Sequence, residues 1–256
     1  INVLSHENDQ NLISLISINE FDIPTEFTPE AISLAEQAQP VKISKGREDL
    51  RDINLITVDG DDARDFDDAI WAEKDKNPHN LNGWRMIVAI ADVAHYVSNG
   101  DPLDIDARKR GNSVYFADRV VPMLPENLSN GLCSLKPNED RGCLAVEIII
   151  DQFGHKKSHR FIRGVMRSKA RLTYEQLEET FNGNKNACSP EIMKLAKSLR
   201  GAYNALSDAR EKRGALNIET TEKVIKINDN GKIDSILPRE RLESHKVIEE
   251  FMVTAN

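Results

Sequence analysis

The feature that most constrains the fold is a crowded run of acids between two apolar segments. Residues 59–68, DGDDARDFDD, contain six aspartates and one positive side chain, Arg64. Strand-like residues precede the run at 53–58 (INLITV) and follow it at 69–73 (AIWAE). Carboxylates beside buried strands lose hydration and repel one another, which is costly unless a cation neutralises them. The sequence therefore predicts a sheet that carries a cation-binding loop.

The residue types in this run indicate which cation it would bind. Oxygen ligands without interleaved His or Cys suit Mg²⁺, with Mn²⁺ as the substitute, rather than zinc. Mg²⁺ usually binds through a few carboxylates together with substrate phosphate. Two such ions about 4 Å apart can activate a water and stabilise the leaving 3′ oxygen of a phosphodiester. The run therefore predicts chemistry on phosphate.

Other acidic motifs fit the run less well. A calcium-binding EF-hand loop starting at Asp59 would need an acceptor at position 63, Gly at 64 and Glu at 70, and the chain has Ala, Arg and Ile there. A haloacid-dehalogenase phosphatase motif fails because Asp65-Phe66-Asp67 is followed by further acid. An Asp-x-Asp glycosyltransferase site survives on spacing alone, and a solvated acidic loop is the non-functional alternative.

A basic segment stands out against the acidic composition. The chain has 42 acidic and 34 basic residues, so a polyanion would need a local basic surface. Residues 152–174 contain seven Lys or Arg and no acid. As one continuous strand, this segment would place on one face Lys157, Arg163, Arg167, Lys169 and Arg171. We expect a surface that follows an RNA backbone, or otherwise a solvated strand face.

Cysteine usage and hydropathy indicate the cellular compartment of the protein. Its three cysteines form no CxxC pair and suit neither a disulfide framework nor a cysteine zinc site. No run approaches the roughly 18 apolar residues of a membrane span, and no signal peptide is evident. We expect a cytoplasmic protein with no membrane partner.

The pattern of helices and strands predicts the α+β (mixed α/β) class. Residues 1–45 form a helical lead-in or linker segment, with Thr28 as N-cap and Pro29 at the first helical position of a helix. Residues 46–256 form the body. Within it we expect strands at 53–58, 69–73, 84–97, 144–151 and 156–174, helices at 102–110, 174–181 and 190–213, and a hairpin at 223–237 whose turn is Asn230-Gly231.

Several long blocks resemble one known family. They are TVDGDDARDFDDAI, WRMIVAIADVAHYV, VYFADRVVPMLPENLSNGLCSLKPNEDRGCLAVEI and KRGALNIET. In order and spacing these blocks resemble the catalytic domain of the ribonuclease II superfamily, from about residue 1 to the chain end. The resemblance implies the N-terminal half of that domain: a mixed sheet with flanking helices around an acidic metal site, without the family's cold-shock and S1 domains.

The resemblance also implies an activity. Members hydrolyse single-stranded RNA processively from the 3′ end, use Mg²⁺ and release nucleoside 5′-monophosphates. The family's four catalytic, metal-binding aspartates fall on Asp59, Asp65, Asp67 and Asp68, which leaves Asp61 and Asp62 as additional acids. A homologue that has lost catalysis and only binds RNA is the non-enzymatic alternative.

Three further positions follow from the family pattern. Tyr115 matches a tyrosine that stacks on the terminal bases of the RNA, and Ile218 occupies the place of the family's second stacking aromatic. Isoleucine lacks a π-face, so stacking on that side is weakened or supplied elsewhere, with Phe116 and Phe161 as candidates. Asp92 recurs in the family, and we expect it to cap the following helix rather than support the metal site.

The family pattern also predicts what lies beyond this chain. The catalytic domain of relatives continues past Asn256, and the missing part includes an arginine that holds substrate phosphate near the metals. We therefore expect this chain alone to have weak activity or none. Apolar surface that the missing half would cover is expected to drive self-association.

Overall fold

The structure is a computed structural model that describes residues 12–116, 118–216, 223–228, 233–238 and 240–256. The chain divides into two compact units. We call the larger one, residues 39–95, 130–217 and 241–256, the sheet unit. The other, residues 1–38, 96–129 and 218–240, is the small unit.

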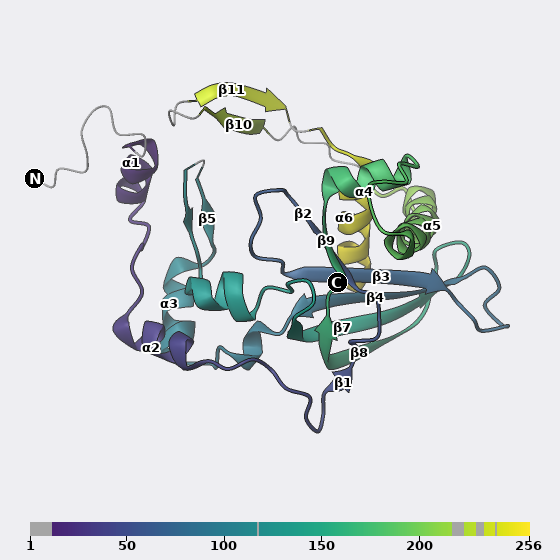
Figure 1. The fold of residues 1–256 in the computed structure, drawn as a ribbon, viewed down its shortest axis with the longest axis horizontal. Helices are drawn as coiled ribbons and strands as arrows, with labels where there is room; N and C mark the ends of the chain where they lie inside the picture. Colours follow the sequence, from purple (N-terminus) through teal and green to yellow (C-terminus); the bar gives the residue numbers. More distant parts are fainter. Residues whose placement is uncertain (1–11, 117, 217–222, 229–232, 239) are drawn as a thin grey trace, which may run out of the picture. The chain divides into compact units, whose positions relative to one another are not determined.

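A seven-stranded mixed sheet forms the centre of the sheet unit. Its strands are β1 (Glu48–Asp49), β2 (Ile56–Asp59), β3 (Asp68–Lys74), β4 (Trp84–Ala91), β7 (Asp140–Ile150), β8 (Lys156–Arg167) and β9 (Ala170–Thr173). They lie in the order β1-β8-β7-β4-β3-β2-β9 (Figure 1). The central pairs are antiparallel, whereas β1 pairs with β8 and β2 with β9 in parallel.

The sheet must curl, because a very short piece of chain joins β8, which lies next to one edge, to β9 at the other edge. Only Ser168 and Lys169 separate β8 from β9, and three residue steps span at most about 11 Å. In a flat sheet these strands would lie five spacings, or about 24 Å, apart. Backbone hydrogen bonds from Leu50 to Val165 (2.8 Å) and from Lys169 to Leu55 (2.8 Å) continue the pairing through the bend. The sheet therefore closes on itself at this end.

The bend corrects one expectation from the sequence. Residues 156–174 were predicted to form one strand, but β8 ends at Arg167 and β9 belongs to the opposite edge. The hydroxyl of Ser168, a buried residue, donates to the carbonyl of Ala170 (3.1 Å), and the Ser168 carbonyl accepts from the backbone of Asn138 (2.8 Å). These local bonds hold the turn that a propensity pattern does not encode.

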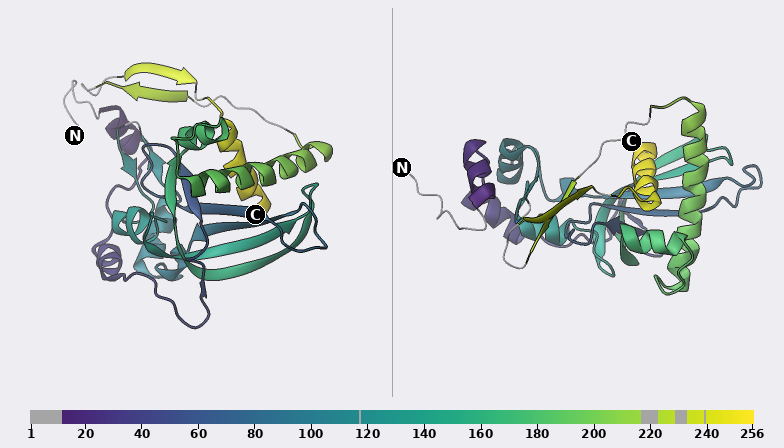
Figure 2. Two further views of the ribbon diagram at one scale, coloured as in Figure 1. Left: turned by 45° about the vertical axis from the view of Figure 1, so that its right-hand side comes forward. Right: turned by 90° about the horizontal axis from the view of Figure 1, so that it is seen from above.

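Three helices cover one face of the sheet. They are α4 (Tyr174–Phe181), α5 (Pro190–Lys212) and α6 (Glu243–Ala255), and Figure 2 shows them on the same side. Alternate residues of the central strands point toward them, among them Ile70, Met86 and Ile148. Together with Leu199 and Phe251 from the helices, these residues form the main core. Burial of this apolar surface is the main force that holds the helices on the sheet.

Capping residues define the ends of α4 and α5. Thr173 and Gln176 form a capping box at the start of α4. Ser189 caps α5, Pro190 is its first residue, and Gly214 follows its end with a φ of +71°. None of the helices in the described ranges is long and apolar enough to cross a membrane.

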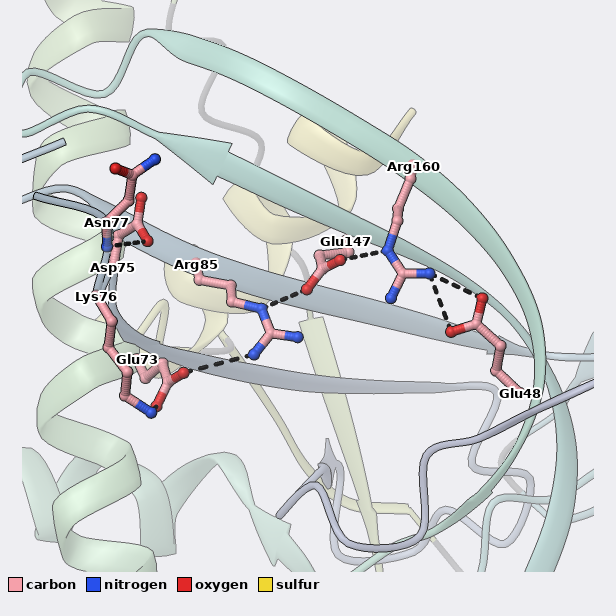
Figure 3. Close-up of polar contacts among 8 residues, drawn as sticks. All are labelled: Glu48, Glu73, Asp75, Lys76, Asn77, Arg85, Glu147 and Arg160. Carbon is pink, nitrogen blue, oxygen red and sulfur yellow. Dashed lines mark hydrogen bonds and ion pairs between the residues drawn. The ribbon is translucent and has the colours of Figure 1, made fainter. Parts of the chain in front are cut away.

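The other face of the sheet carries a row of alternating charges, which we call the charge ladder (Figure 3). It consists, strand by strand, of Glu73, Arg85, Glu147, Arg160 and Glu48. Arg85 lies 3.5 Å from Glu73 and donates to Glu147, while Arg160 bonds Glu147 at 2.5 Å and Glu48 at 2.8 Å. Desolvation opposes the charge on Glu147, but the hydrogen bonds from Arg160 and Arg85 outweigh it and lower its pKa. The ladder thus ties five adjacent strands in register.

The small unit contains short elements. They are α1 (Leu12–Glu20), α2 (Pro29–Gln37), α3 (Pro102–Arg110), the pair β5 (Val114–Tyr115) and β6 (Val120–Val121), and the hairpin strands β10 (Lys223–Ile227) and β11 (Ile233–Pro238). Thr28 caps α2 as predicted, and its backbone and hydroxyl both donate to Asp106 of α3 (2.8 and 2.9 Å). The predicted hairpin is present, while its Asn230-Gly231 turn lies outside the described residues.

Candidate active site

The four predicted aspartates lie on one short connection within the sheet unit. Asp59 ends β2, Asp68 begins β3, and Asp65 and Asp67 lie between them. Pairing of Ile56 with Ile70 fixes the two strands that carry this connection. We call Asp59, Asp65, Asp67 and Asp68 the carboxylate cluster.

The segment between the strands is anchored from outside by Ser134. This buried hydroxyl accepts from the backbone of Phe66 (3.0 Å) and donates to the carbonyl of Arg64 (3.0 Å). The Phe66 carbonyl in turn accepts from the backbone of Leu135 (2.8 Å). A residue about seventy positions away in sequence therefore sets the path of the acidic segment, and nothing in the local sequence indicated it.

Arg171 of β9 holds the first part of the segment. Its guanidinium donates to the carbonyls of Gly60 (2.5 Å) and Asp61 (2.9 Å), and it lies 5.6 Å from the ring centre of Phe66. The buried Nε of Arg171 has no hydrogen-bond partner among the described residues. The sequence predicts RNA binding by Arg171, whereas its hydrogen bonds in the structure go to the backbone of the acidic segment.

Burial and mutual repulsion raise the pKa values of three members of the cluster. Desolvation, followed by the charge of Asp68, raises the pKa of Asp59 to about 7, although Arg171 partly offsets this. Desolvation and the charge of Asp67 raise the pKa of Asp68 to about 6. The pKa of Asp67 is also raised, by desolvation and by Asp65, even though its surface is exposed. The four carboxylates thus form one electrostatically coupled group.

The chemistry of the cluster fits a hard divalent cation. One carboxylate oxygen of Asp59, Oδ2, is buried without a hydrogen-bond donor in the described part of the chain. A bound cation would neutralise this charge and offset the repulsion that raises the neighbouring pKa values. Within the described ranges, no three His, Cys, Asp or Glu side chains are already grouped as a metal site. The donors available for an ion are carboxylate oxygens, which suit Mg²⁺ or Mn²⁺.

The predicted basic face is not formed as one surface. Arg163 binds Asp92, Arg167 binds Asp140 (2.7 Å), and Lys169 lies exposed in the bend between β8 and β9. Arg171 lies on β9, at the edge of the sheet remote in strand order from β8. The prediction that these residues share one strand face is therefore wrong, because the strand ends at Arg167.

Asp92 has a different role from the expected helix cap. Its nearly buried side chain accepts from Arg47 (2.6 Å) and twice from Arg163 (2.8 and 3.2 Å). Desolvation opposes the charge of Asp92, yet the hydrogen bonds from Arg163 and Arg47 lower its pKa. Its backbone amide also continues the β4–β7 pairing by donating to Gly142 (3.0 Å). The ion pairs of Asp92 with Arg47 and Arg163 fasten the end of β4 to β8. The role of Arg47 could not be predicted from the sequence, because only the fold brings it there.

One of the two predicted base-stacking positions, Tyr115, lies in the small unit. Tyr115 is on β5 with 63% of its surface exposed, and pairs with Val120 of β6. Ile218 lies outside the described residues. The stacking roles of both positions stay predictions.

Comparison with known proteins identifies the family. Residues 47–256 match the RNB domain. Ribonuclease R of Vibrio parahaemolyticus is 43% identical over 264 residues, covering 100% of this chain and 31% of that protein. Ribonuclease R of Escherichia coli K12 is 40% identical over 246 residues, covering 94% of this chain and 30% of that protein. The chain thus spans about a third of the length of these curated relatives.

A solved structure agrees with the sequence comparisons. Mycoplasma genitalium RNase R, in complex with ribose methylated single-stranded RNA, superposes with a TM-score of 0.92 at 29% identity. The match covers 100% of this chain and 40% of that one. The chain therefore belongs to the RNB domain family, which confirms its resemblance to the ribonuclease II superfamily.

Proposed function

We propose that the protein containing this chain is a Mg²⁺-dependent, processive 3′→5′ exoribonuclease that hydrolyses single-stranded RNA to nucleoside 5′-monophosphates. Family membership supports hydrolysis of RNA in general terms. The observation that carries the proposal is the buried Oδ2 of Asp59, which has no hydrogen-bond donor among the described residues and lies in a cluster of like charges. Such a group costs stability unless the cation that the reaction needs is also the cation that completes the fold.

The carboxylate cluster (Asp59, Asp65, Asp67 and Asp68) would hold the metal ions. When bound, two Mg²⁺ ions would supply an activated water and stabilise the leaving 3′ oxygen. The chain's own groups position the acids: Ser134 fixes the path of the segment at Phe66, and Arg171 holds its first carbonyls. Arg171 also offsets part of the rise in the pKa of Asp59, which favours the charged form that binds a cation.

The remaining features are proposed on the same basis. Tyr115 and Ile218 would contact the 3′-terminal bases, and a cytoplasmic location follows from cysteine usage. Because the chain covers about a third of its relatives, we propose that it is weakly active or inactive alone and that it self-associates. A strictly monomeric sizing profile would count against self-association. The Asp-x-Asp glycosyltransferase alternative is set aside, since the family match accounts for the same residues.

The test is a degradation assay with the full-length protein and with this chain. We expect a 5′-labelled single-stranded RNA to shorten stepwise from its 3′ end in Mg²⁺, with release of nucleoside 5′-monophosphates, and EDTA to stop the reaction. Asp68→Asn should lower the rate by orders of magnitude in the full-length protein. Asp62→Asn is the matched control, because Asp62 is an exposed acid of the same segment outside the cluster.

Three outcomes would contradict the proposal. Equal loss of activity in both variants would show a general need for negative charge rather than specific ligands. Undiminished cleavage by Asp68→Asn would remove the cluster from the chemistry. RNA binding without turnover by the full-length protein would favour the catalytically silent homologue.

A further inference from the structure

One strand of the sheet carries an exposed basic and aromatic row. Alternate residues of β8 point to the same side of the sheet, and on one side these are His159, Phe161, Arg163 and, past a β-bulge at Lys157, Lys156, which pairs with Ile150. We call these four residues the β8 stripe. All four are exposed, and 77% of the surface of Phe161 is accessible. The rings of His159 and Phe161 meet edge to face, with centres 5.4 Å apart.

Phe161 lies just beyond the part of the sheet that the helices cover. Its partner across the strand pair is Val146, which is buried in the core with Val88 and Ile70. The cross-strand neighbours Ile70, Val88, Val146 and Phe161 therefore form a row that runs from the buried core to an exposed aromatic ring on β8. A phenylalanine this exposed contributes little to folding, so its ring is available to a ligand.

The next row of the same face leads to the carboxylate cluster. Strand register places Arg163 beside Leu144, Leu144 beside Ile90, and Ile90 beside Asp68. Leu144 and Ile90 are 47% and 42% exposed, although both lie on central strands. Arg163 and Asp68 are three strand spacings, or about 14 Å, apart. An apolar floor thus connects the β8 stripe with a predicted metal ligand.

The charges on this face suit a polyanion that also has flat apolar groups. Residues 152–174 contain no acid, and Lys156 of the stripe is exposed, with no salt bridge seen among the described residues. Arg163 keeps 47% of its side-chain surface exposed while it binds Asp92. Proteins that hold single-stranded RNA combine basic groups along the backbone with aromatic rings on which bases stack, and sheet faces serve this purpose well.

We propose that the β8 stripe, with Leu144 and Ile90, is a track for single-stranded RNA on which Phe161 stacks a base. This inference rests on the proposed function, because it takes RNA as the ligand and Asp68 as the end of the track. The role proposed for Phe161 is base stacking on this face of the sheet. Phe161 is not proposed to replace the family's second stacking aromatic, whose position Ile218 occupies.

The test measures RNA binding without catalysis. Fluorescence anisotropy with a labelled single-stranded RNA in EDTA would compare the full-length protein with Phe161→Ala and Phe161→Trp. Loss of one stacked base should weaken binding on the order of 5- to 150-fold in the alanine variant, and tryptophan should restore it. Lys156→Gln should weaken binding and reduce its dependence on salt.

Phe153→Ala provides the matched control. Phe153 is 53% exposed and lies near His155, with ring centres 6.3 Å apart, in the turn that joins β7 to β8. We expect RNA affinity to be unchanged in this variant. Circular dichroism would verify that each variant is folded.

The outcomes separate this inference from the proposed function. Equal affinity of the Phe161→Ala variant and the unmodified protein would overturn the track, and would leave the stripe as a surface for another segment of protein. An equal loss in the Phe153→Ala variant would overturn it as well. If the full-length protein binds RNA through Phe161 but does not cleave it, the proposed function fails while the track stands. If Asp68→Asn abolishes cleavage and Phe161→Ala leaves RNA binding intact, the proposed function is supported and the track is refuted.

Discussion

Replacing Asp59 by asparagine is expected to stabilise the metal-free chain at pH 8 and to have little effect near pH 4. The pKa of Asp59 rises from 3.8 to about 7 on folding, mainly through desolvation and the charge of Asp68. Between these two values the folded chain holds a proton that the unfolded chain has released, so stability falls as pH rises. A rise of about three pKa units corresponds to at most about 4 kcal/mol at pH 8.

Asparagine keeps the shape of the side chain and removes the charge, so this cost disappears. We expect a gain of about 2–4 kcal/mol in the free energy of unfolding at pH 8, part of it from relief of Asp68. Urea unfolding followed by circular dichroism in EDTA would measure it, as a rise of about 1 M in the midpoint. Mg²⁺ should stabilise the unmodified chain at pH 8 and stabilise the Asp59→Asn variant much less.

The comparison across pH makes this reasoning refutable. Both proteins share every other titrating group, so the difference between their pH profiles isolates position 59 and the acids coupled to it. A variant that is less stable by the same amount at pH 4 and pH 8 would show that Asp59 is a satisfied carboxylate. Its unpaired Oδ2 would then have no energetic consequence.

Three further predictions concern stability. Glu147→Gln should cost about 1–3 kcal/mol in urea unfolding, because Arg85 and Arg160 lose their shared acid; an unchanged midpoint would make the charge ladder energetically neutral. Asp92→Ala should cost about 3–5 kcal/mol, since it leaves the buried guanidinium of Arg47 unpaired, and a loss under about 1 kcal/mol would contradict this. Gly154→Ala should prevent stable folding, measured by circular dichroism, because φ is +81° and the added Cβ would lie 2.1 Å from a backbone oxygen of α5.

Sequence reasoning succeeded where the signal is local. Thr28 and Pro29 mark a helix start by their own chemistry, and the structure places the start of α2 where they predict. The α+β class and the strands on either side of the acidic segment follow from hydrophobic periodicity. The crowding of the carboxylate cluster was also readable, because its members are neighbours in sequence.

Sequence reasoning failed where distant segments meet. The split of residues 156–174 depends on Ser168 bonding within its own turn and on β9 pairing with β2. The same limit applies to Ser134, which anchors Phe66 from 68 residues away. A serine or an arginine carries no mark of its partner until the chain has folded, so these positioning groups cannot be read from spacing alone.

The closure of the sheet has a consequence for how this chain reaches its native state. Residues 48–59 pair with residues 164–173, so the cluster-bearing end of β2 gains its neighbour β9 only after more than a hundred intervening residues have been organised. Contacts of such long sequence separation slow folding, because loop-closure entropy is lost before the pairing compensates for it. During synthesis the acidic segment would emerge well before Arg171, the cation that tempers Asp59. The burial that desolvates the carboxylate cluster is thus completed late, when most of the hydrophobic core is available to oppose its cost.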